Sequence, residues 1–108
     1  MKKKFLDAFH GLLFGLRHRS IMIQFLLGLC IVTAGLLLKF TLEEWLAVII
    51  LIGLVISAEI FNTCIEMICD KICPDYDETI GKIKDLSAAG VLVCALSAFI
   101  AALVIVLF

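Results

Sequence analysis

The chain has 108 residues, of which 64% are hydrophobic, and its mean hydropathy is +1.21. A soluble domain is nearer half apolar, so this composition indicates a membrane protein, and the length limits it to one domain (residues 1–108) with a few spanning helices. The net charge of −1 provides no positive field that would attract nucleic acid. The five cysteines form neither a CxxC pair nor a Cys/His cluster, so we expect them to be small apolar packing residues.

Near the start of the chain, apolar residues recur at helical spacing: Phe5, Leu6, Phe9, Leu12, Leu13 and Leu16. Basic and polar residues take the intervening positions, beginning with Lys2, Lys3 and Lys4. This pattern predicts an amphipathic helix over about residues 3–18 that lies on the membrane surface. No small-residue cleavage site follows, so we expect no removable signal peptide.

The first predicted membrane span covers about residues 20–38, which contain no charge and a single amide, Gln24. At 1.5 Å per residue these nineteen residues extend about 28 Å, close to the thickness of the hydrocarbon core. A short polar turn follows, in which Thr41 and Glu44 have the spacing of a capping box at the start of the next helix. Trp45 then stands where an interfacial aromatic residue is expected.

The second predicted span covers about residues 45–69, and Pro74 is expected to end its helix. Residues 74–78 form the most polar segment of the chain, so we place them outside the lipid. The third predicted span covers about residues 86–108, a run of twenty-three residues without a charge. The fold expected from these patterns is an all-α membrane protein with one surface helix and three transmembrane helices.

The basic residues fix the expected orientation of these spans. Three spans put the N-terminal helix and the loop at residues 70–85 on the same side of the membrane, and eight of the nine Lys and Arg residues lie there: Lys2, Lys3, Lys4, Arg17, Arg19, Lys71, Lys82 and Lys84. By the positive-inside rule this side is cytoplasmic, where ATP and Mg²⁺ are found. We therefore predict a multi-pass membrane protein whose N-terminus and loop at residues 70–85 are cytoplasmic.

The end of the second span carries polar residues on one helix face. At about 100° per residue, Glu59, Asn62, Glu66 and Asp70 fall within roughly a quarter-turn of one another. Acids within a membrane are costly unless they face a bundle interior, a partner or a water-filled cavity. The stripe therefore predicts a functional site that opens toward the cytoplasm.

These residue types suit phosphoryl transfer. A partly desolvated carboxylate such as Glu59 can take a proton from an alcohol, and Glu66, roughly 10 Å nearer the cytosol, can hold a hard divalent cation. Lys84 offers positive charge to phosphate oxygens, and further oxygen ligands come from Asp75, Asp77 and Asp85. The chain contains neither a Walker motif nor a kinase-type glycine loop.

Each of these residues also has a structural explanation. Glu59 could hydrogen-bond to a neighbouring helix, Glu66 and Asp70 could be interfacial acids, and Asp85 could be the N-cap of a helix. From spacing alone, the chain is a membrane protein with an ionisable intramembrane site. A small proton-coupled transporter would explain the acids in the membrane, but it gives no reason for Lys84 and Asp85 or for the polar loop.

Two segments resemble the small bacterial integral-membrane diacylglycerol kinase family, which includes undecaprenol kinases. Residues 59–70 match its pattern E-x-x-N-[ST]-[AC]-I-E-x-x-x-D, and Lys84 and Asp85 match a K-D pair that stands fourteen positions later and precedes small residues. The resemblance extends over nearly the whole chain. It implies an ATP-dependent lipid kinase of the bacterial cytoplasmic (inner) membrane, which uses Mg²⁺ and forms a homotrimer with sites shared between subunits.

The resemblance also implies roles for individual residues. Glu59 corresponds to the catalytic base and Asn62 to the neighbouring active-site amide, while Glu66 corresponds to the metal-binding carboxylate. The residues expected to contact the nucleotide are Asp75, Tyr76, Asp77, Lys84 and Asp85. Whether the acceptor lipid is diacylglycerol or a polyprenol such as undecaprenol stays open, because it depends on the shape of an apolar groove.

One position departs from the family pattern. The family usually carries a second metal-binding glutamate just before the first span, where this chain has His18 and Arg19. Either the metal is held by Glu66, ATP phosphates, water and loop acids such as Asp75 or Asp77, or the chain is a weakly active or non-catalytic relative. We assign His18 no metal role, because Mg²⁺ prefers oxygen ligands.

Overall fold

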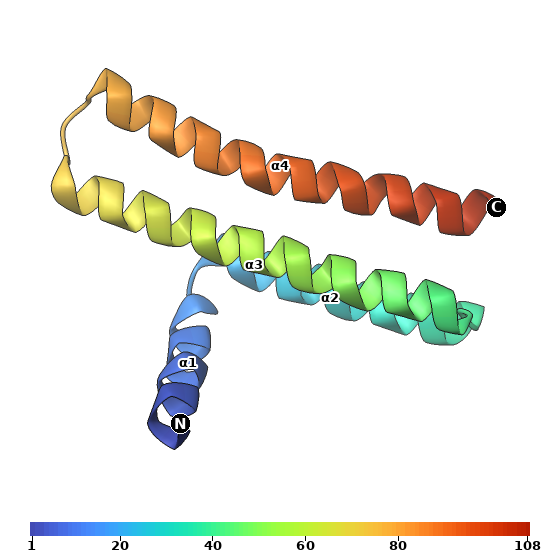
Figure 1. The fold of residues 1–108 in the computed structure, drawn as a ribbon. Coiled ribbons are helices and arrows are strands. Elements are labelled where there is room, and N and C mark those ends of the chain that lie inside the picture. Colours follow the sequence, from blue (N-terminus) through green and yellow to red (C-terminus); the bar gives the residue numbers. More distant parts are fainter.

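The computed structural model describes all 108 residues as four α-helices without strands: α1 (Lys2–Gly15), α2 (Arg19–Leu38), α3 (Leu42–Ile72) and α4 (Glu78–Leu107) (Figure 1). This confirms an all-helical chain. The three long helices α2, α3 and α4 are each long and apolar enough to cross a membrane. The predicted surface helix corresponds to α1, which ends at Gly15, three residues before the predicted end at residue 18.

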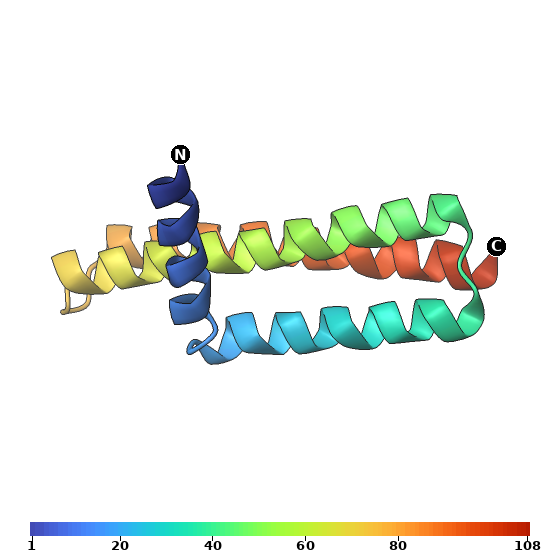
Figure 2. The same ribbon diagram turned by 90° about the horizontal axis from the view of Figure 1, so that it is seen from below.

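Helix α3 is the central element, because it packs against both α2 and α4 (Figure 1). Figures 1 and 2 show the three long helices running alongside one another in alternating directions, with α1 turned across them at the start of α2. α3 and α4 also extend past the start of α2 in both views. At 1.5 Å per residue α3 is about 46 Å long, whereas the hydrocarbon core is about 30 Å thick, so part of α3 extends beyond the hydrocarbon.

Few side chains are buried within this single chain. Only nine of the 108 residues are buried, and α4 buries none. Most large apolar side chains on the long helices are exposed, among them Leu37, Leu54, Leu92 and Phe99. In water such a surface would be unfavourable, whereas lipid tails solvate it as well as a protein core does. The burial pattern therefore agrees with helices that lie in a bilayer.

The turn between α2 and α3 is tightly built. Thr41 Oγ1 accepts a hydrogen bond from the Glu44 amide at 3.2 Å, and Glu44 Oε1 accepts one from the Thr41 amide at 3.0 Å. The predicted capping box is thus confirmed. The rings of Phe40 and Trp45 meet edge to face at 5.5 Å. A Cβ added at Gly35 would lie 2.7 Å from Phe40 Cδ2 and 2.8 Å from Trp45 Cη2, so this close approach requires glycine.

The turn between α3 and α4 is short and polar. α3 ends at Ile72, just before Pro74, and α4 begins at Glu78. Asp77 is the N-cap of α4, because its Oδ2 accepts a hydrogen bond from the Ile80 amide at 2.9 Å. The alternative that Asp85 caps a helix is therefore wrong: Asp85 lies in the third turn of α4. The earlier start of α4 extends it alongside the last turns of α3.

Candidate active site

The buried polar side chains of the molecule all lie on α3. Glu59, Asn62 and Thr63 are each 8% exposed, although α3 as a whole is largely exposed. They follow Val48 and Val55 on the part of α3 that is covered by its neighbours. Burying a carboxylate and an amide costs free energy unless each finds a partner. The carboxylate of Glu59 makes no hydrogen bond within the chain.

Asn62 connects the buried part of the stripe to its outer part. Its Nδ2 donates a hydrogen bond to Glu66 Oε1 at 2.8 Å. A carboxylate can only accept, so this contact fixes the orientation of the amide and turns Oδ1 away from Glu66. Asn62 Oδ1 is buried and has no partner. The amide therefore holds one oxygen of Glu66 and presents an unused acceptor one turn from Glu59.

Thr63 contributes to the geometry of the backbone at this point. Its Oγ1 donates to the Glu59 carbonyl at 2.9 Å, four residues earlier in α3. Such a bond satisfies a hydroxyl that would otherwise be unpaired in the helix. The Thr63 hydroxyl therefore has a partner, and within this set Asn62 Oδ1 is the fully buried polar atom that has none.

An ion pair joins α3 and α4 near the polar turn. Lys84 Nζ lies 2.6 Å from Asp70 Oδ1, and both side chains are substantially exposed. Lys84 was predicted to face phosphate oxygens, and the contact with Asp70 was missed. A signal was present, because Asp70 and Lys84 flank a turn that reverses the chain. The pair places the first turns of α4 beside the outer end of the stripe.

The other residues that were predicted to contact the nucleotide lie on the surface of the molecule. Asp75, Asp77 and Asp85 are exposed, and Tyr76 is 91% exposed. Asp77 already uses one carboxylate oxygen to cap α4. None of these side chains is hydrogen-bonded to Glu59, Asn62 or Glu66. The structure thus brings together Glu59, Asn62 and Glu66 on one face of α3, and separately pairs Asp70 with Lys84. No hydrogen bond connects either group to the side chains of Asp75, Tyr76, Asp77 or Asp85.

Two further polar groups at this end were not predicted as site residues. Ser87 Oγ is buried without a partner. Its exposure is intermediate, as is that of Lys84 and Val91, and this spacing marks the face of α4 that packs on α3. His18 is the N-cap residue of α2, its ring meets Phe14 at 5.3 Å, and its Nδ1 is also buried and unpaired. Only the side-chain packing reveals these two unpaired atoms.

No three of the His, Cys, Asp and Glu side chains lie close enough together to hold a metal ion within one chain. Glu66 is the exposed carboxylate of the Glu59–Asn62–Glu66 group, and the Asn62 amide engages one of its oxygens. This donor set consists of hard oxygens. It matches the way Mg²⁺ is usually bound, through one or two carboxylates together with substrate phosphates rather than in an all-protein cage.

Comparison with known proteins identifies the family. A family model described as prokaryotic diacylglycerol kinase matches residues 7–106, which is nearly the whole chain. Searches of curated proteins and of solved structures gave no match. The matched range includes the stripe on α3, the polar turn and the pair at Lys84 and Asp85. The chain therefore belongs to the prokaryotic diacylglycerol kinase family.

Proposed function

We propose that this protein transfers the γ-phosphoryl group of ATP to the hydroxyl of a membrane lipid at the cytoplasmic end of α3. The observation that carries this proposal is the buried, unpaired carboxylate of Glu59 beside the Asn62–Glu66 hydrogen bond, in a chain of a kinase family. Phosphoryl transfer requires positioning, charge neutralisation and one proton acceptor. Glu59 is suited to accept the proton, and Glu66 and Lys84 are suited to neutralise charge. Asn62 and Asp85 are suited to positioning.

Glu59 is the proposed catalytic base. One carboxylate oxygen takes the hydroxyl proton while the lipid oxygen attacks the γ-phosphorus, so that a new P–O bond forms. The bond between the γ-phosphorus and the β,γ-bridging oxygen breaks, and ADP leaves with that oxygen. The unpaired Oδ1 of Asn62 is one turn along α3, so it is available to accept a hydrogen bond from the protonated Glu59.

Glu66 is the residue we propose to hold Mg²⁺, through the carboxylate oxygen that Asn62 does not engage. When bound, the ion neutralises the charge of the ATP phosphates. Asn62 then has a positioning role, because its Nδ2 fixes the carboxylate of Glu66. His18 and Arg19 supply no further carboxylate near the start of α2.

The nucleotide contacts are proposed for Lys84, Asp85 and the polar turn at residues 75–77. Lys84 keeps N–H donors that Asp70 does not use, and the turn is exposed. We further propose the orientation that places this turn in the cytoplasm, α1 on the inner membrane surface, and assembly into a homotrimer. The exposed apolar side chains of α1, including Phe5, Leu6 and Phe9, suit a helix on the lipid surface.

The decisive test uses Glu59→Gln, which keeps size and polarity but removes the proton acceptor. We expect transfer of radiolabelled phosphate from ATP to extracted lipid to fall by roughly 10²- to 10⁴-fold, the usual contribution of a general base. Glu43→Gln is the matched control, because Glu43 is exposed in the first turn of α3, at its other end. Normal lipid phosphorylation by Glu59→Gln, with assembly unchanged, would rule out its role as base.

A further inference from the structure

His18 stands at the junction of α1 and α2, and its two ring nitrogens have different surroundings. Nδ1 is buried and has no hydrogen-bond partner. Nε2 makes no hydrogen bond within the chain either, but it is not buried, and the residue as a whole is partly exposed. The edge-to-face contact with Phe14 holds the ring in this position. The imidazole therefore connects the interior of the chain with solvent.

The packing of α2 against α3 determines which residues of the two helices lie at the same level. A Cβ added at Gly28 would lie 3.1 Å from Ile52 Cγ2, and one added at Gly35 would lie 2.8 Å from Trp45 Cη2. The two helices run in opposite directions (Figures 1 and 2), so one residue back along α2 corresponds to one residue forward along α3. Residues at the same level therefore have numbers with the same sum.

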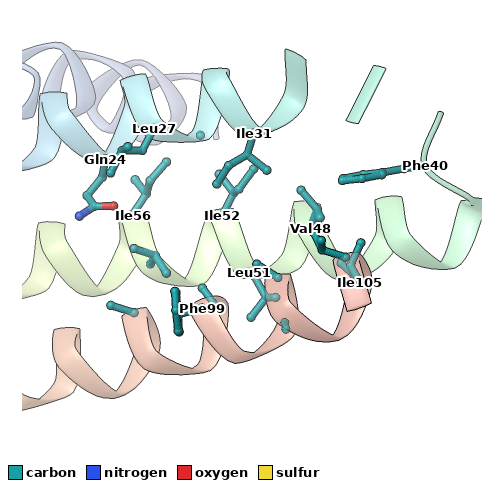
Figure 3. Close-up of a pocket in the computed structure, with 17 residues that line it drawn as sticks. Gln24, Leu27, Ile31, Phe40, Val48, Leu51, Ile52, Ile56, Phe99 and Ile105 are labelled. Carbon is teal, nitrogen blue, oxygen red and sulfur yellow. The ribbon is translucent and has the colours of Figure 1, made fainter. Parts of the chain in front are cut away.

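This count agrees with the apolar groove that lies between α2, α3 and α4 (Figure 3). Gln24 and Ile56 both line the groove, and Figure 3 shows them at the same level, as the count requires. About one turn nearer to α1, Ile21 is level with Glu59. Ile21 is 2% exposed and Glu59 is 8% exposed, so α2 and α3 are also closely packed at this level.

The same count places His18 level with Asn62, about 4.5 Å along the helix axis from the level of Glu59. His18 Nδ1, Asn62 Oδ1 and the carboxylate of Glu59 thus lie within about one helical turn of one another along the axis. None of the three has a hydrogen-bond partner in the chain. One water molecule suits all three, because it can accept a hydrogen bond from protonated Glu59 and donate to the other two groups.

We propose that His18 carries the proton of each turnover from Glu59 to solvent through one such water. The proton that Glu59 takes from the lipid hydroxyl must leave before the next turnover. The O–H of Glu59 turns from Asn62 Oδ1 to the water and gives up its proton. The water passes one of its own protons to His18 Nδ1 and keeps its other hydrogen on Asn62 Oδ1. The imidazolium then releases a proton to solvent, and Glu59 is again ionised.

The other ionisable groups around His18 do not suit this role. Arg17 and Arg19 flank it and are exposed, but a guanidinium group stays protonated. α3 contributes the two glutamates of its polar stripe, of which one is the proton donor and the other is the proposed magnesium ligand. On α1, His10 is exposed and lies about two turns before His18. An imidazole gains and loses a proton readily near neutral pH. His18 does not touch the reacting atoms and acts through Glu59, so this inference rests on the proposed lipid kinase function.

The test measures kcat for transfer of radiolabelled phosphate from ATP to extracted lipid. His18→Ala removes both ring nitrogens, and we expect kcat to fall by roughly tenfold or more, with KM for ATP and the Mg²⁺ dependence unchanged. His18→Asn keeps a polar group near the position of Nδ1 but cannot carry a proton, so we expect a similar loss. His10→Ala is the matched control, because His10 is an exposed histidine on α1.

Added imidazole separates proton transfer from packing. In His18→Ala, imidazole in the assay buffer should restore kcat in proportion to its concentration, because the free base can take the proton from the water. Pyrazole has nearly the same shape but is a much weaker base, so it should not restore kcat. Neither compound should restore activity to Glu59→Gln, which lacks the first proton acceptor.

Several results would overturn the role of His18. Full kcat in His18→Ala or in His18→Asn would show that no proton passes through the ring, and equal rescue by imidazole and pyrazole would show that the ring only fills space. A raised Mg²⁺ requirement with unchanged kcat would place His18 at the metal. In each of these cases Glu59→Gln still loses lipid phosphorylation, whereas normal phosphorylation by Glu59→Gln would remove the proposed base as well.

Discussion

The two ends of the three long helices are built differently. At the α2–α3 turn, the capping box satisfies the backbone amides of Thr41 and Glu44, and Gly35 leaves room for the paired rings of Phe40 and Trp45. The buried polar atoms that have no hydrogen-bond partner lie at the other end. The three buried polar atoms without a partner are His18 Nδ1, Asn62 Oδ1 and Ser87 Oγ, and all belong to the end that carries Glu59 and Glu66.

This difference separates stability from chemistry. Unpaired buried polar atoms are unfavourable, and proteins keep them mainly where a ligand or a reaction uses them. Substitutions at the α2–α3 turn, the closed end, should therefore lower stability without a direct effect on catalysis. Substitutions at the end that carries Glu59 and Glu66, the open end, should act mainly on catalysis. Substitutions at the two ends should fall into these two classes.

After Glu59→Gln, the largest effect at the open end is expected from Glu66→Ala. It removes the proposed magnesium ligand and the partner of Asn62, so the Mg²⁺ concentration for half-maximal activity should rise by roughly 100-fold or activity should disappear. The free energy of unfolding should also fall, by about 1–3 kcal/mol, because the buried Asn62 Nδ2 loses its acceptor. The measurement is a magnesium titration of lipid phosphorylation at fixed ATP. An unchanged titration would contradict metal binding at Glu66.

At the closed end, Gly35→Val should give the largest loss of stability. Its Cβ would lie within 3 Å of the rings of Phe40 and Trp45, so the turn must repack, at a cost of about 1–3 kcal/mol. Unfolding in mixed micelles with an increasing fraction of denaturing detergent measures this loss. Gly53→Val is the control, since a Cβ there meets nothing within 4 Å. Reduced turnover per folded Gly35→Val molecule would contradict the separation of the two ends.

Sequence patterns predicted most of the elements because the signals are local. The capping box at Thr41 and Glu44 depends on residues three apart, and the apolar runs that become α2, α3 and α4 need only length and composition. The shared face of Asn62 and Glu66 likewise follows from helical periodicity, and their hydrogen bond confirms that these two side chains meet.

Other features depend on contacts between helices, which spacing within one helix does not determine. The pair of Asp70 and Lys84 forms only because α4 begins at Glu78 and runs back along α3. The start of α4 was also ambiguous from the sequence, because Asp77 and Asp85 are both suitable N-cap residues. Only Asp77 caps the helix. The groove between three helices and the unpaired Ser87 Oγ required the packed structure.

Thr41→Ala should cause a smaller loss of stability at the closed end than Gly35→Val. It removes the side-chain acceptor for the Glu44 amide, and loss of such an N-cap costs typically about 1 kcal/mol. The same unfolding measurement should detect it, with lipid phosphorylation per folded molecule unchanged. Thr33→Ala is the control, because Thr33 donates only to a carbonyl within α2, at Leu29. Equal stability of both variants would show that the cap does not stabilise α3.

The smallest effect is expected from Asp70→Asn, which breaks the ion pair with Lys84 at the edge of the open end. Exposed pairs contribute little to stability, so the unfolding midpoint should fall by less than in Thr41→Ala. Lys82→Gln, which breaks the pair with Glu78 at 3.6 Å, is the control within α4. Lys84 remains charged in Asp70→Asn and is then free to contact phosphate, so KM for ATP should fall or stay the same. Loss of most activity would instead show that Asp70 holds Lys84 in position for the nucleotide, and the functional end of α3 would then extend one turn beyond Glu66.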